Sequence, residues 1–179
     1  MIPKAARLLL LLVLTSFIAV AAGRPAIIEA VRNGDRETLR VLLQKGANVN
    51  ETEPDGATAL HWASYRDDLQ SADALFKAGA KVNAANDLGT TPLWMASQNG
   101  SDAMVKRLLD AGANPNLALL SGETPLMVAA RTGSASVARL LIAKGANVNA
   151  AGTRKQTALM WAVGQKHPEV VKVLLANKA

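Results

Sequence analysis

The chain has 179 residues, a length typical of one domain, and half of its residues are hydrophobic while only 3% are aromatic. It contains no cysteine, which excludes disulfides, thiol catalysis and cysteine-based metal sites. The formal net charge of +6 comes from 20 Lys and Arg against 14 Asp and Glu, and these residues are scattered, which argues against a nucleic-acid-binding patch.

The first 22 residues have the pattern of a secretory signal peptide. Lys4 and Arg7 precede an apolar stretch, and small residues follow at a cleavage point after Ala22 or Ala21. The apolar stretch is shorter than the span of about 20 residues that crosses a membrane. An uncleaved anchor and a buried helix are the alternatives. We expect the mature protein, residues 23–179, to act outside the cytoplasm, in the periplasm of a Gram-negative bacterium or otherwise secreted.

From residue 24 onwards the same residues recur every 33 positions. Each copy has a threonine, a leucine two residues later and an alanine five residues later, and a glycine recurs at the same interval. The recurring threonines and glycines are Thr58, Thr91, Thr124, Thr157, Gly46, Gly79, Gly112 and Gly145. A fixed period of this length indicates one small unit stacked on copies of itself.

The repeated phrases resemble those of the ankyrin-repeat family. Residues 88–97 read Leu-Gly-Thr-Thr-Pro-Leu-Trp-Met-Ala-Ser, close to the Gly-x-Thr-Pro-Leu-His-x-Ala-Ala opening of an ankyrin repeat, and most units close with Gly-Ala-x-Val-Asn or a near variant. The resemblance extends from about Arg24 to the C-terminus. It implies an all-α ankyrin-repeat solenoid of about five stacked helix-turn-helix units, joined by short β-turn or hairpin loops. The approximate repeats are 24–50, 51–83, 84–116, 117–149 and 150–179.

Local signals place two helices in each unit. Thr91 and Thr124 precede a proline, which predicts a hydroxyl N-cap and a proline in the first helical turn. The recurring glycine should end the second helix in a left-handed conformation. The candidate caps of the second helices are Asp35, Asp68, Ser101 and Ser134.

The two ends of the predicted array differ. Glu29 stands where later copies have an apolar residue, which fits an end unit that meets water. Residues 170–175 keep an interior-like apolar pattern, and no glycine closes that unit. The apolar end is frayed, docks onto something, or belongs to a longer array.

The candidate reactive residues have structural explanations. The resemblance implies that His61 bonds to Thr58 and that His167 is a scaffold residue at the start of a helix. We expect Trp62, Trp94 and Trp161 to be core residues, and a stacking platform is the alternative. No triad, phosphate-binding loop or metal-like spacing is present in the sequence, so we expect no catalytic residue, cofactor or metal.

The family resemblance implies a concave groove lined by turn tips and by the first helices. The expected tips are Asp55, Ala57, Leu88, Thr90, Ser121, Glu123, Arg154 and Gln156. The expected helix ends are Tyr65, Arg66, Gln98, Asn99, Arg131, Thr132 and Gln165. Tyr65 with Arg66 is the most anchor-like pair. We expect a monomer that binds a protein partner there, with no nucleic acid and no membrane after signal cleavage. The alternative is self-association through the apolar C-terminal face.

Overall fold

The computed structural model describes residues 24–179, so the predicted signal peptide lies outside the described residues. Within that range the helices form five pairs. They are α2 (Ala26–Asn33) with α3 (Arg36–Gln44), α4 (Ala59–Tyr65) with α5 (Leu69–Lys77), α6 (Pro92–Asn99) with α7 (Asp102–Asp110), α8 (Pro125–Thr132) with α9 (Ala135–Ala143), and α10 (Ala158–Gly164) with α11 (Pro168–Ala176). This architecture confirms the predicted all-α solenoid. We number the pairs repeats 1 to 5.

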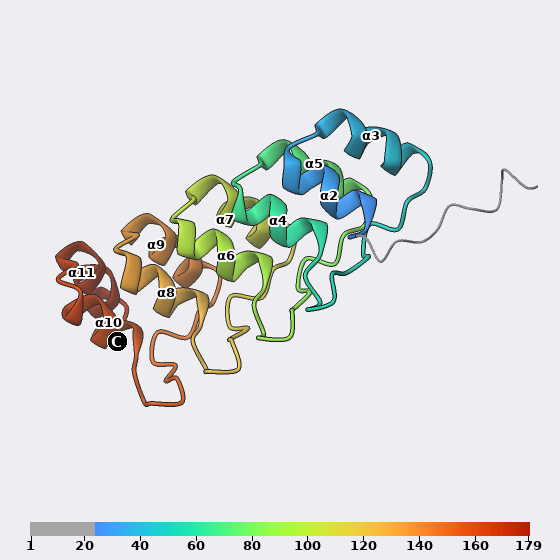
Figure 1. The fold of residues 1–179 in the computed structure, drawn as a ribbon. Coiled ribbons are helices and arrows are strands. Elements are labelled where there is room, and N and C mark those ends of the chain that lie inside the picture. Colours follow the sequence, from blue (N-terminus) through green and yellow to red (C-terminus); the bar gives the residue numbers. More distant parts are fainter. Residues whose placement is uncertain (1–23) are drawn as a thin grey trace, which may run out of the picture.

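The pairs stack side by side in an elongated array of two layers (Figure 1). First helices pack on first helices and second helices on second helices, and the long loops between repeats project together from one side (Figure 1). In the described residues these loops are turns, with a single β-bridge between Thr52 and Thr58. The array therefore presents one continuous edge of loops and first helices.

The predicted threonine caps start the first helices. The hydroxyl of Thr91 accepts a hydrogen bond from the Trp94 N–H at 3.2 Å, and Thr124 does the same for Met127 at 3.3 Å. A hydroxyl at this position satisfies one of the free N–H groups of the first turn. Asp35, Asp68 and Ser101 likewise cap the second helices.

Two of the second helices lack such a cap. Ser134 was expected to cap α9, but its side chain makes no capping bond. Its Oγ instead lies 3.4 Å from the Thr132 hydroxyl. His167 precedes α11 and also makes no capping bond, because its Nε2 lies 3.1 Å from the Arg131 carbonyl of the preceding repeat. The Ser134 hydroxyl and the His167 ring therefore contact neighbouring polar groups and do not cap the helix.

Small residues allow the first helices to approach closely. Ala63, Ala96, Ala129 and Ala162 are all fully buried where one first helix meets the next. Leu60, Leu93 and Leu126 fill the space beside them. The core is thus a continuous strip along the array, and each repeat completes the core of its neighbours.

The recurring asparagine of the closing phrase links each repeat to the next. Asn83 Nδ2 donates to the Gly112 carbonyl at 3.1 Å, and its Oδ1 accepts from the Asn114 N–H at 2.8 Å. Asn50 and Asn116 make the equivalent pairs of bonds. These bonds explain why asparagine recurs in the phrase, because one side chain satisfies a donor and an acceptor of the neighbouring backbone.

Candidate protein-binding surface

The loops and first helices of repeats 2 and 3 enclose a hollow of about 290 Å³. We call it the tyrosine hollow. Its lining residues are Glu53, Asp55, Ala57, His61, Trp62, Tyr65, Asn86 and Met95. It combines apolar side chains with two carboxylates, Glu53 and Asp55. Such a hollow suits a partner that inserts an apolar side chain next to a polar or cationic one.

The aromatic wall of the tyrosine hollow is fixed by polar contacts. The Trp62 Nε1–H donates to Glu53 Oε2 at 2.6 Å, and Arg24 pairs with the other oxygen of that carboxylate. The Arg32 guanidinium lies 4.7 Å from the centre of the Trp62 ring. Tyr65 packs edge-on against Trp62, with 5.9 Å between ring centres, and remains exposed. A rigid indole thus supports an accessible tyrosine, the kind of side chain that often anchors an interface.

A second hollow of about 470 Å³ lies between repeats 4 and 5, and we call it the arginine hollow. Its lining residues are Ser121, Glu123, Met127, Arg131, Gly152, Thr153, Arg154, Gln156 and Trp161. Arg131 pairs with Glu123 at 3.1 Å and lies 5.8 Å from the centre of the Trp161 ring. Arg131 is therefore held in place, and the exposed Arg154 adds a positive charge at the rim.

Two leucines at the loop tips lie between the hollows along the chain. Leu88 and Leu120 are both exposed, and the Leu120 N–H donates to the Leu88 carbonyl at 2.9 Å. Leu88 was an expected tip, whereas Leu120 was not, because it precedes the equivalent position, Ser121, by one residue. Exposed apolar tips beside two hollows make this edge more apolar than an ordinary solvated loop surface.

The predicted groove residues fall into two rows of equivalent positions. Tyr65 and Arg131 line the hollows, and Gln98 is the equivalent residue of the repeat between them. Asp55, Glu123, Arg154 and Gln156 also line the hollows. These residues form one connected surface along the loops and first helices.

The residues of the other row, Arg66, Asn99 and Thr132, contact the ends of the first helices and the turns that follow them. Asn99 Nδ2 donates to the Tyr65 carbonyl at 2.7 Å, and the Thr132 hydroxyl donates to the Val128 carbonyl at 3.1 Å. Arg66 lies beside the turn at Gly34 of repeat 1. Arg66 therefore does not share the tyrosine hollow with Tyr65, although the two residues are adjacent in sequence.

Thr90 was expected at an exposed tip, and the structure corrects this. It is buried, its N–H donates to Asn86 Oδ1 at 2.9 Å, and its carbonyl contacts His61. Its position next to the helix cap Thr91 draws it into the interface between repeats, where its backbone groups find partners.

The tryptophans are less buried than expected for core residues, although Trp62 and Trp161 do pack against the core. Trp62 and Trp161 are only partly buried and line the two hollows. Trp94 is partly buried as well, and its Nε1–H has no partner among the described residues. Trp62 and Trp161, which directly precede a recurring alanine, thus contact both a hollow and the core.

His61 has the structural role that the family resemblance implies. Its Nδ1 accepts from the Thr58 N–H at 3.0 Å, and its Nε2 lies 2.9 Å from the Thr90 carbonyl. Those partners assign the neutral tautomer with the proton on Nε2. The ring joins repeat 2 to repeat 3, and burial lowers the pKa of His61 more than the attraction of the Thr90 carbonyl, Asp55 and Glu53 raises it.

We expect this histidine to make stability depend on pH. The folded state resists protonation at His61, whereas the unfolded chain takes up a proton near the ordinary pKa of about 6.5. The contribution of neutral His61 is complete above that pH and is lost as pH falls below it, by at most about 1.4 kcal/mol per pH unit. Urea unfolding between pH 7.5 and 5.5 measures the loss. The His61→Gln variant, which keeps His167, should lose this dependence, and equal slopes in both proteins would contradict the assignment.

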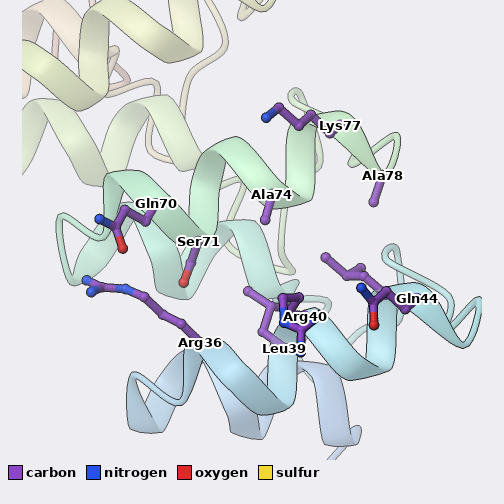
Figure 2. Close-up of a pocket in the computed structure, with 10 residues that line it drawn as sticks. Arg36, Leu39, Arg40, Gln44, Gln70, Ser71, Ala74, Lys77 and Ala78 are labelled. Atoms are coloured by element: carbon purple, nitrogen blue, oxygen red, sulfur yellow. The ribbon is translucent and has the colours of Figure 1, made fainter.

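The face opposite the loops has a hollow of about 490 Å³ between α3 and α5 (Figure 2). Leu39 and Ala74 face each other across it, and Lys77 points away from α3 (Figure 2). Arg36 crosses to repeat 2, where it pairs with Asp68 at 2.9 Å. A similar hollow separates α7 and α9, so these gaps follow from the spacing of the second helices and do not mark a distinct site.

The part of the chain that the structure describes contains no group of three or more His, Cys, Asp or Glu that could hold a metal ion. Among the described helices, none has the length and apolar character required to cross a bilayer.

The fold and the groove define a repeat scaffold, the class of protein that presents an extended recognition surface. The chain belongs to the ankyrin-repeat family: the family described as ankyrin repeats (3 copies) matches residues 5–86, 27–119 and 93–179. No curated protein is similar enough to this chain to serve as a relative. Ankyrin repeats generally mediate protein–protein interaction and are typically non-catalytic.

Proposed function

We propose that this chain acts outside the cytoplasm as a non-catalytic protein that binds a protein partner through its concave groove. The observation that supports the groove is the pair of hollows on one edge of the array, each with a partly exposed tryptophan ring in contact with an arginine. Action outside the cytoplasm is inferred from the signal-like pattern of residues 1–22 alone.

The charges of the hollows suggest how a partner is oriented. Asp55 lies in the tyrosine hollow, while Arg154 lies in the arginine hollow two repeats further on. A partner segment with a basic residue near one end and an acidic residue near the other would complement both. Charge complementarity of this kind sets orientation and encounter rate more than affinity.

A pull-down from the exported fraction of the source cells tests the proposal. The native protein should retain a discrete partner, and Tyr65→Ala/Arg131→Ala should weaken retention by about 30-fold or more, because Tyr65 is exposed and Arg131 partly exposed, each next to a fixed tryptophan ring. The matched control is Gln70→Ala/Lys77→Ala on the opposite face, which should retain the partner. A native protein that retains nothing, or a groove variant that binds as well as the control, would refute the groove assignment.

The alternative proposal, self-association through the C-terminal face, has one observation in its favour. Met160, Val163 and Leu175 are exposed on repeat 5. Sedimentation of the mature chain at high micromolar concentration tests it, and a strict monomer argues against it. The charge of that repeat also disfavours contact with a second copy.

A further inference from the structure

The outer face of repeat 5 consists of the positions that, in each earlier repeat, pack against the following repeat. Met160 and Val163 are each 59% exposed and Leu175 is 55% exposed. One repeat earlier, the equivalents of the first two, Met127 and Ala130, are 1% and 0% exposed. The residues equivalent to Val163 in repeats 1 to 3 are also fully buried. They are Val31, Ser64 and Ser97.

Repeat 5 replaces recurring glycines of this face with lysines. Lys155 occupies the position of Gly122 in the preceding repeat and keeps the left-handed backbone, with φ of 59° against 77°. A Cβ on Gly122 would lie 2.9 Å from the Gly152 Cα of the following repeat. Lys155 thus places its side chain where the backbone of a further repeat would lie.

A second lysine of repeat 5 also replaces a glycine of the preceding repeat. Lys166 takes the position of Gly133, again with a left-handed φ of 61°. A Cβ on Gly133 would lie 2.7 Å from Nδ1 of His167 in the following repeat. A side chain at the position of Lys166 is tolerated inside the array, because Asp67 of repeat 2 occupies it with φ of 55° and accepts a hydrogen bond from Ser101 of repeat 3. Lys155 is therefore the residue that another ankyrin unit or a second copy of this chain would displace in order to pack in the ordinary register. The face is therefore apolar but unsuited to the packing used inside the array.

The net charge of the described residues is concentrated in repeat 5. Residues 24–149 have 13 basic and 13 acidic side chains, whereas residues 150–179 have five basic side chains and one acidic. The five are Arg154, Lys155, Lys166, Lys172 and Lys178. Lys172 is exposed on α11 and pairs with Glu169, the one acidic residue of the repeat, at 2.7 Å. An excess of positive charge in the repeat that carries the apolar patch disfavours contact with a second copy and favours an acidic partner.

We propose that the outer face of repeat 5 binds an amphipathic helix of a protein partner, with apolar residues on one side and acidic residues flanking them. The exposed side chains of α10 and α11 provide the apolar contact, and the lysines provide the charge complement. Helices bind such surfaces through apolar anchors at helical spacing. A membrane surface fits less well, because the exposed large apolar residues of this face include no aromatic anchor.

Fluorescence anisotropy with a labelled 18-residue model helix tests the proposal, using leucines at helical spacing and glutamates on both flanks. The mature chain should bind this peptide, and binding should weaken as salt is raised. A peptide of the same pattern with lysines in place of glutamates should not bind. The chain is also titrated with vesicles containing phosphatidylglycerol, and binding to vesicles but not to the acidic peptide would overturn the choice of occupant.

Variants locate the site. Lys166→Glu/Lys172→Glu should weaken binding by about tenfold or more, and Val163→Ser/Leu175→Ser should weaken it similarly because the apolar contact is lost. The matched control Lys45→Glu/Lys81→Glu makes the same charge change in repeats 1 and 2 and should bind as the native chain does. Tyr65→Ala/Arg131→Ala should also bind, which separates this surface from the groove. Circular dichroism confirms that each variant is folded. Equal affinity in all variants, or no binding by the native chain, would overturn the proposal.

Discussion

Replacing Leu126 with alanine should lower the free energy of unfolding by about 2–5 kcal/mol. Leu126 is almost completely buried at the start of α8, inside the strip of core that repeats 3, 4 and 5 share. Removing its side chain leaves a cavity between neighbouring first helices that cannot fully close, because α8 is packed against both α6 and α10. Urea unfolding of the mature chain measures the loss.

The matched control is Leu175→Ala, which makes the same chemical change on the outer face of repeat 5. Because Leu175 is more than half exposed, its truncation should cost less than about 1 kcal/mol. Losses of similar size at both positions would contradict the account, since they would mean that the face of repeat 5 is covered as thoroughly as an internal interface.

The second large effect is expected from Gly122→Lys. The residue has φ of 77°, and a Cβ there would lie 2.9 Å from the backbone of the following repeat. Left-handed strain and the forced displacement of repeat 5 should together cost about 2–5 kcal/mol. Thermal and urea unfolding both report this loss.

The opposite change in the equivalent position of repeat 5, Lys155→Gly, provides the comparison. It relieves the left-handed strain and removes no contact with another repeat, so it should stabilise the chain by up to about 1 kcal/mol. The structure indicates that a following repeat crowds position 122 and that, among the described residues, nothing crowds position 155. Destabilisation by Lys155→Gly, or tolerance of Gly122→Lys, would contradict this difference.

The 33-residue period predicted the fold, because each recurring residue has one structural task at its place in the repeat. Thr91 and Thr124 cap their helices as expected, Gly112 and Gly145 end theirs in the left-handed conformation, and Ala96 allows two helices to meet. These tasks depend on neighbours within one repeat, or at the same position of the next, and both are visible in an aligned sequence.

The groove was harder to predict, because a side chain's exposure depends on the neighbouring repeat. Thr90 and Leu88 are both loop residues, yet contact with His61 buries the first and nothing covers the second. Trp62 appeared to be a core residue, but its Nε1–H bond to Glu53 holds it at the edge of a hollow. A polar residue nine positions before a tryptophan gives no recognisable signal, since the loop that brings the two together has no fixed pattern.

Side-chain exposure at the end of the array was equally hard to predict from the sequence. The sequence showed an apolar pattern in residues 170–175, but only the structure separates the buried Val170 and Leu174 from the exposed Leu175. The lysines at glycine positions were visible as departures from the repeat. The effect of these lysines on packing depends on which of the equivalent glycines lie against the backbone of the next repeat. The sequence alone does not show this.

Photo-crosslinking in the source cells tests the groove most directly. A photoreactive residue is placed at Tyr65, inside the tyrosine hollow, and in a separate variant at Gln70, on the opposite face. The account predicts a covalent adduct of one discrete mass from position 65 and none from position 70. An adduct from position 70 alone, or no difference between the two positions, would contradict it.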